Sequence, residues 1–91
     1  MTMKNVAITE TKIILTNEVG LHARPAAKFV KLAAGFKSKI KVRKGENEAD
    51  AKSITSILFL DAKRGEEITI WAQGEDSNLA VESLTKLVRT L

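Results

Sequence analysis

The segment 20–25, which reads G-L-H-A-R-P, holds the side chains best suited to chemistry. His22, the only histidine of the chain, directly precedes a helix that we predict from Ala23 onward. The first backbone N–H groups of a helix have no partner, and the helix dipole adds a positive field, so an anion is favoured there. Arg24 adds a fork of donors suited to phosphate oxygens, and Pro25 stiffens the turn. The segment predicts a histidine that attacks a phosphoryl donor and holds the group it accepts.

A plain surface helix cap is the competing interpretation of His22, and local features alone favour it. Glu18 is the only acid within four residues of His22, which predicts against a catalytic triad. The chain has no cysteine and no second histidine, so thiolate and multi-histidine metal sites are excluded. We therefore expect no metal and no cofactor.

Ser53 is the second candidate, at the predicted N-cap of a short helix over 54–60. A phosphate there would lie in a favourable helix field, but serine is a common N-cap and the local sequence favours a structural role. We expect Trp71 to pack against neighbouring strand side chains rather than to form a binding surface. We also expect Leu58 and Phe59 to fill the core, at least in part.

Hydrophobic periodicity predicts the elements that must position these side chains. We expect strands at 11–16, extended by 6–9 if the pattern continues, then at 39–44, 48–51 and 67–73. Helices are expected from Ala23 to a left-handed end at Gly35, at 54–60, and from residue 77 to the end. Ala26, Phe29, Val30 and Ala33 form the apolar stripe of the first helix. This order predicts an α+β fold, an antiparallel sheet covered on one face by helices.

Length and charge narrow the class of protein. Ninety-one residues allow one domain. A net charge of +4 suggests an acidic partner, which is nucleic acid, a phosphorylated ligand or an acidic protein surface, and a basic surface kept only for solubility is the equal alternative. The basic strand at 39–44 has no interleaved aromatics, so we expect a solvated sheet edge rather than a nucleic-acid surface. The longest apolar run, residues 57–60, is too short for a membrane span, and the polar start predicts a cytoplasmic protein.

Collinear motifs extend this pattern along most of the chain. They are G-L-H-A-R-P-A-A at 20–27, F-V-K at 29–31, G-F at 35–36, A-K-S at 51–53, Gly65, I-T-I at 68–70 and G-E-D at 74–76. From about residue 12 to 91 the chain resembles, without a gap, HPr, the histidine-containing phosphocarrier family of the phosphoenolpyruvate-dependent sugar phosphotransferase system. The resemblance implies an open-faced β-sandwich of four antiparallel strands under three helices, in the order βαββαβα, as one domain over 1–91.

The resemblance also implies roles for individual residues. His22 is expected to be phosphorylated at Nδ1 by phospho-enzyme I and to pass the group to a sugar-specific enzyme IIA, with Arg24 beside the phosphoryl oxygens. Ser53 matches the serine that HPr kinase/phosphorylase modifies in some bacteria. Leu21, Lys28, Lys31 and Ile54 are expected to contact partners, and the bases Arg24, Lys28 and Lys31 to steer a monomer toward acidic surfaces.

Four departures from the family pattern stand out. Residues 1–9 are partly an N-terminal extension, K-G-E-N at 44–47 replaces an Asn-Gly turn, Thr55 and Ser56 are small and polar, and Asp61 stands where glycine is common. Two other functions remain open. One is a regulatory paralogue of the nitrogen-related phosphotransferase branch, and the other is a small basic nucleic-acid-binding module.

Overall fold

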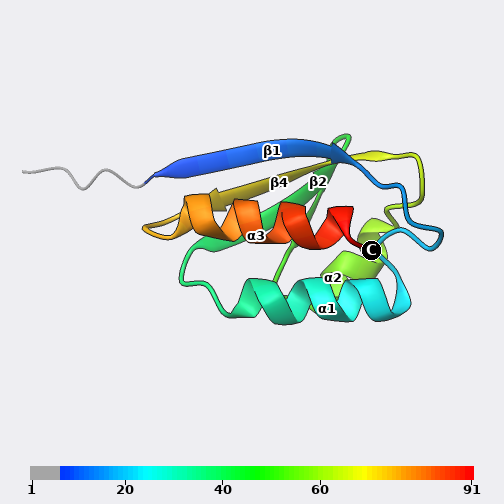
Figure 1. Cartoon of the computed structure of the whole chain (residues 1–91), viewed down its shortest axis with the longest axis horizontal. Helices are drawn as coiled ribbons and strands as arrows, with labels where there is room; N and C mark the ends of the chain where they lie inside the picture. The colour runs from blue at the N-terminus through cyan, green and yellow to red at the C-terminus, as the bar shows by residue number, and fades with distance from the viewer. Residues whose placement is uncertain (1–6) are drawn as a thin grey trace, which may run out of the picture.

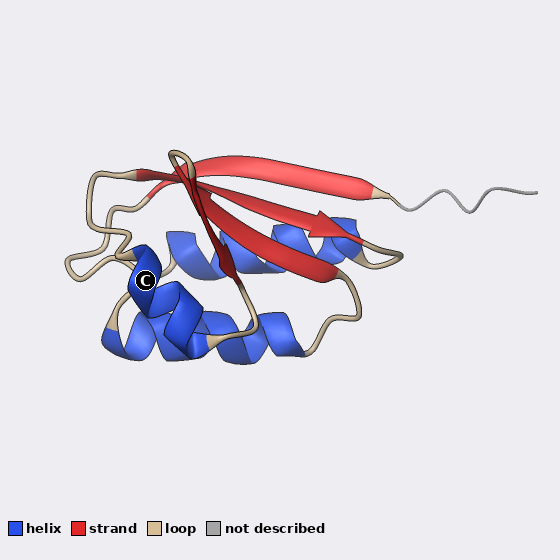
Figure 2. Cartoon of the chain, turned by 180° about the vertical axis from the view of Figure 1, so that it is seen from behind, coloured by secondary structure: helices blue, strands red, loops and turns tan. Residues whose placement is uncertain are grey.

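The computed structural model describes residues 7–91, in which four strands and three helices follow one another. In chain order these are β1 (Ile8–Ile14), α1 (Ala23–Ala34), β2 (Lys39–Lys44), β3 (Asn47–Asp50), α2 (Ile54–Leu60), β4 (Glu67–Gln73) and α3 (Ser77–Arg89). The strands form one antiparallel sheet in the order β1-β4-β2-β3, and the helices lie together on one side of it (Figure 1, Figure 2). The predicted open-faced sandwich is confirmed.

The core lies between the sheet and the helices. In β4, Ile68, Ile70 and Ala72 are buried, while the alternate residues face the open side, as the period of two predicts. The buried residues of the helices are Ala26, Phe29 and Ala33 in α1, Ile57 and Leu60 in α2, and chiefly Ala80, Leu84 and Val88 in α3. Burial of a large apolar side chain stabilises the fold by about 1.5–3 kcal/mol. This packing holds the N-terminal end of α1, and hence His22, in a fixed place.

The uncovered face of the sheet carries charged side chains around Trp71. Lys41 Nζ lies 5.5 Å and Arg43 Cζ 5.8 Å from the centroid of the Trp71 ring. Glu48 accepts hydrogen bonds from both bases, at 3.5 Å from Lys41 Nζ and 2.8 Å from Arg43 Nε. Trp71 therefore packs against strand neighbours, as expected. The expected edge position of this basic strand is wrong, because β2 lies between β4 and β3.

The bounds of the first strand differ from the prediction. β1 runs from Ile8 to Ile14, and Leu15 leaves the ladder because the partner strand begins at Glu67, opposite Ile14. Ile8 and Thr9 pair with β4, so residues 8 and 9 belong to the sheet and not to an extension. Residues 1–6 lie outside the described part of the chain, so the predictions that concern them lie outside it as well.

The C-terminal end of α1 also differs. Gly35 has a φ of −76° and not the expected left-handed conformation. Its N–H bonds to the carbonyl of Leu32, and the N–H of Phe36 bonds to the carbonyl of Ala33. The helix thus ends in tight right-handed turns, which need no positive φ at Gly35.

Helix α2 exposes two side chains that the sequence predicts in the core. Leu58 is 39% exposed and Phe59 is 83% exposed, so that prediction is wrong. Residues 57–60 of α2 form an unbroken apolar run, which gives no periodicity, and only Ile57 and Leu60 of this run are buried. Leu58 and Phe59 therefore form part of an apolar surface outside the core.

Candidate functional site

His22 is the N-cap of α1, as the sequence predicts. Its backbone is extended, with φ −127° and ψ 163°, and its side chain makes no capping hydrogen bond. The imidazole is 38% exposed, so a partner can reach it. The next residue, Ala23, has a φ of 53°, a left-handed conformation that costs a residue with a Cβ about 1–2 kcal/mol. Such strain persists only where the surrounding structure holds it, often at functional sites.

The loop that precedes His22 is anchored to the loop that follows α2. Leu21 N–H donates to the carbonyl of Ala62 at 2.9 Å, and Asn17 Nδ2 donates to the carbonyl of Gly20 at 2.8 Å. Leu21 is fully buried. The expectation that Leu21 contacts a partner is therefore wrong, because its apolar side chain belongs to the core.

The same anchor brings His22 beside Asp61, which lies 39 residues later. His22 Nε2 is 2.7 Å from Asp61 Oδ1. Asp61 is the C-cap of α2 in the left-handed conformation, with φ 52° and ψ 47°, which aspartate tolerates better than most residues. The other oxygen, Oδ2, is 3.4 Å from Lys63 Nζ, and Lys44 Nζ donates to the Asp61 carbonyl at 2.9 Å.

The charge state of Asp61 determines the direction of this hydrogen bond. The bond from His22, helped by the charge of Lys63, holds the pKa of the Asp61 carboxyl below its usual range. An ionised carboxylate can only accept, so the proton of the bond is on Nε2. The sequence shows only one acid, Glu18, within four residues of His22. The acid that His22 contacts, Asp61, lies 39 residues later and was missed. The signal that could have found Asp61 is its departure from glycine in the family pattern.

Three bases lie on the exposed side of α1 near His22 in the sequence. Arg24, Lys28 and Lys31 are exposed, and within residues 7–91 none of them forms an ion pair with an acid. By contrast, Arg43 and Lys44 of β2 pair with Glu48 and Glu66. The free positive charge of α1 is thus available to an anion or to an acidic partner.

Ser53 is the N-cap of α2, and its hydroxyl accepts a hydrogen bond from Ser56 N–H at 3.2 Å. Its predicted capping role is confirmed. Ile54 is 40% exposed and, with Leu58 and Phe59, forms what we call the α2 apolar surface. Helix α2 packs beside the N-terminal half of α1 (Figure 1, Figure 2). The α2 apolar surface therefore lies on the helix next to the one that begins at His22.

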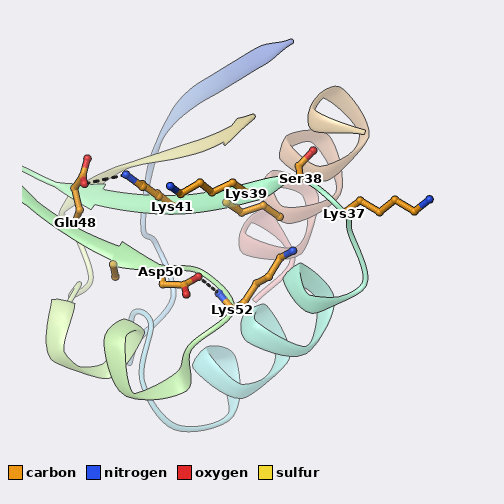
Figure 3. A pocket seen from close by; sticks show the side chains of 9 residues that line it. Lys37, Ser38, Lys39, Lys41, Glu48, Asp50 and Lys52 are labelled. Carbon is orange, nitrogen blue, oxygen red and sulfur yellow. Dashed lines mark hydrogen bonds and ion pairs between the residues drawn. The ribbon is translucent and has the colours of Figure 1, made fainter. Parts of the chain in front are cut away.

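A groove of about 480 Å³ lies at the other end of α1 (Figure 3). Its charged lining residues are Lys37, Lys39, Lys41, Lys52, Glu48 and Asp50. Helix α1 has 12 residues and is about 18 Å long, which separates the groove from His22. None of the residues predicted for the site lines it, and its two acids offset part of the lysine charge.

Two further observations concern metal ions and membranes. Within residues 7–91, no three His, Cys, Asp or Glu side chains lie close enough together to hold a metal ion. In the same part of the chain, no helix is both long enough and apolar enough to cross a membrane.

The open-faced sandwich thus carries an exposed histidine at the N-terminus of α1, and within residues 7–91 the three exposed bases of that helix form no ion pair. Such a site suits a small carrier of an anionic group. Comparison with known proteins makes the class specific. The family model "PTS HPr component phosphorylation site" matches residues 9–90. The chain belongs to the HPr family, and it is a phosphocarrier of the phosphotransferase system.

The relatives and neighbours agree with this assignment. The chain is 46% identical over 82 residues to phosphocarrier protein HPr of Haemophilus influenzae, covering 90% of this chain and 94% of that protein. It is 35% identical to phosphocarrier protein NPr of Shewanella violacea, covering 87% of each. It is 40% identical to the phosphoryl donor subunit DhaM of a PEP-dependent dihydroxyacetone kinase from Providencia stuartii, covering 87% of this chain but only 17% of that protein. A crystal structure of HPr from Thermoanaerobacter tengcongensis superposes with a TM-score of 0.88 at 39% identity, covering 90% of this chain and 92% of that one.

Proposed function

We propose that this phosphocarrier holds its phosphoryl group on His22. In this proposal phosphorylated enzyme I donates the group, an enzyme IIA domain of sugar uptake accepts it, and the protein works as a cytoplasmic monomer with no cofactor. The observation that carries the proposal is the reachable imidazole of His22 at the N-cap of α1. The only histidine of the chain stands at a helix N-terminus, where the helix field and the exposed bases of α1 favour an anion.

The site suits transfer in both directions. A carrier must accept and release the group readily, which a shallow and exposed site allows better than a closed pocket. The first-turn N–H groups of α1 and the guanidinium of Arg24 are the donors that would stabilise the phosphoryl oxygens. Since Arg24 forms no ion pair within residues 7–91, it need not break one to bind them.

Partner docking would combine two surfaces. Arg24, Lys28 and Lys31 supply positive charge, and Ile54 supplies part of the α2 apolar surface. A partner with an apolar centre and an acidic rim fits this arrangement, because apolar contacts give affinity and opposite charges speed encounter. We include Lys28, Lys31 and Ile54 in the proposed interface for this reason.

A second candidate is a carrier of a regulatory branch, such as the nitrogen-related one. The 35% identity to an NPr supports it, since the two chains are similar over 87% of this one. The same His22 chemistry would operate, with a different donor and acceptor. A nucleic-acid-binding role is disfavoured because Lys41, Arg43 and Lys44 are paired with acids.

Ser53 is proposed as a regulatory phosphorylation site for HPr kinase/phosphorylase. Its side chain is part-exposed and caps α2, beside Ile54 of the α2 apolar surface. A phosphate there would add close to two negative charges to a surface meant for an acidic partner. Like charges across an interface weaken docking, so the modification would lower transfer without unfolding the protein.

The test is incubation of the purified protein with phosphoenolpyruvate and enzyme I, followed by intact-mass spectrometry. We expect one acid-labile phosphate on the wild type and none on His22→Ala. Parallel reactions with a nitrogen-branch enzyme I distinguish the two candidate branches. Phosphate that persists on His22→Ala, or that is acid-stable, would contradict the proposal.

A further inference from the structure

The hydrogen bond between His22 and Asp61 points to a role for an acid that the sequence did not predict at the site. We propose that Asp61 is a positioning residue: its carboxylate holds the proton of His22 on Nε2, so that Nδ1 is the atom that accepts the phosphoryl group. The inference rests on the proposed function and deepens it. It is carried by the 2.7 Å distance from Nε2 to Oδ1 and by the anchors that fix both residues.

Both partners of this bond are held by their backbones. The residues next to them, Leu21 and Ala62, share the 2.9 Å hydrogen bond that ties the two loops together. Lys44, at the end of β2, binds the carbonyl of Asp61 itself. The pair is therefore built into the meeting of α1, α2 and the sheet, and it does not depend on two long flexible side chains finding each other.

The ring has two nitrogens, and the structure uses one of them. Nε2 is bonded to Asp61, and the part of the chain that the structure describes gives Nδ1 no hydrogen-bond partner. In a neutral imidazole, a proton on Nε2 leaves the lone pair on Nδ1. The contact thus selects the tautomer whose nucleophilic atom is the one left open for a donor.

The same carboxylate acts on the transfer step. The Nδ1 lone pair forms the new bond to phosphorus, the bond from phosphorus to the donor protein breaks, and its electron pair leaves with the donor. The Nε2 proton stays on the ring, which therefore gains positive charge as the new bond forms. Asp61 faces that charge from the Nε2 side and stabilises it, as carboxylates do beside catalytic histidines.

Lys63 offsets part of the negative charge of Asp61. Its Nζ is 3.4 Å from Asp61 Oδ2, on the oxygen that His22 does not use. This partner offsets part of the repulsion that a carboxylate would exert on an incoming phosphoryl group. Lys63 is 66% exposed, so the offset is modest and screened by solvent.

The chain offers well-matched variants for the test. Asp61→Gly removes the carboxylate and suits the φ of 52°, so the fold is kept. Asp61→Asn keeps an acceptor oxygen without the charge, and Lys63→Ala is the control that removes only the neighbouring base. Because His22 is the only histidine, ring ¹⁵N chemical shifts of untagged, histidine-labelled protein report its tautomer without overlap.

Two readouts are needed: the ¹⁵N tautomer shifts at a pH where the ring is neutral, and single-turnover transfer from phosphorylated enzyme I. We expect the wild type and Lys63→Ala to hold the proton on Nε2. Asp61→Gly should show a mixture of tautomers and transfer about 10- to 100-fold more slowly, as expected for loss of one charged hydrogen bond. Asp61→Asn should keep the tautomer and transfer at an intermediate rate.

The outcomes separate this inference from the proposed function. A wild-type protein that accepts no phosphate overturns the proposed function and, with it, the role of Asp61. A wild type that accepts phosphate while Asp61→Gly matches it in tautomer and rate overturns the role of Asp61 alone. Faster transfer by Asp61→Gly also overturns it, because the carboxylate would then repel the phosphoryl group.

Discussion

Replacement of Gly20 by alanine should destabilise the fold and separate His22 from Asp61. Gly20 has a φ of 60°, and a Cβ there would lie 2.2 Å from the carbonyl oxygen of Ala62. Real Cβ contacts of this kind do not occur, so the two loops must move apart. The hydrogen bond from Leu21 to Ala62 is the first interaction that such a movement breaks.

The magnitude follows from three contributions. A left-handed alanine costs about 1–2 kcal/mol relative to glycine. Loss of one backbone hydrogen bond costs about 1 kcal/mol, and leaving its buried groups without partners adds about 1–3 kcal/mol. The sum is roughly 3–6 kcal/mol, which is a large part of the stability of an ordinary small domain.

Gly45 provides a matched control. It has the same φ of 60°, but a Cβ there meets nothing within 4 Å. Gly45→Ala should therefore lose only the backbone part, about 1–2 kcal/mol. Urea unfolding of both variants gives the free energies, and the difference between them isolates the contact with Ala62.

The His22 ring supplies the second measurement. In Gly20→Ala the ¹⁵N shifts of His22 should lose the signature of a proton held on Nε2, whereas Gly45→Ala should keep it. Equal destabilisation by the two substitutions, with unchanged His22 shifts in both, would refute the argument that the loop contact sets up the site.

Three more predictions test charge at single positions. Arg24→Ala should slow transfer from enzyme I about 10- to 100-fold with an unchanged circular dichroism spectrum, whereas Arg89→Ala, the same change of charge on α3, should transfer normally; equal rates would remove Arg24 from the site. Asp76 accepts hydrogen bonds from the Ser38 hydroxyl and from the N–H groups of Lys37 and Ser38, which lower its pKa below the ordinary 3.8. The stabilisation from ionised Asp76 is present above about pH 4 and is lost as the pH falls through the lowered pKa. Asp76→Asn should therefore be less stable than the wild type at pH 7, and its stability should fall less steeply in acid. Urea unfolding from pH 7 to 3 measures both, and parallel curves would contradict this. Ser53→Asp should melt at or above the wild-type temperature yet accept phosphate from enzyme I more slowly at low salt; a wild-type rate would leave Ser53 as a cap only.

Periodicity and cap chemistry sufficed for most of the fold. The stripe of Ala26, Phe29 and Ala33 and the alternation in β4 are local patterns, and burial follows them directly. Ser53 is an N-cap because a hydroxyl can accept from the N–H three residues on, and this too is local. The N-cap position of His22 was predictable for the same reason, since helix starts are visible in sequence. Its role as the phosphoryl acceptor was predicted from the family resemblance, because local features alone favour a plain cap.

The errors concern features that depend on distant partners. The end of β1 is set by where β4 begins, and the burial of Leu21 is set by the loop after α2. Within α2 every core candidate is apolar, so only the packed structure shows that Phe59 faces outward. Sequence periods cannot supply these facts, because the determining residue lies tens of positions away.

Asp61 combines the two kinds of information. A residue with a Cβ is more strained than glycine at a left-handed C-cap, so its presence there suggests a compensating interaction. The structure supplies that interaction in the 2.7 Å bond to His22, across 39 residues. A departure from the family pattern at a position with positive φ is therefore a place to look for an added function. The aspartate introduces backbone strain that glycine would avoid, and it provides a contact with His22 that glycine cannot make.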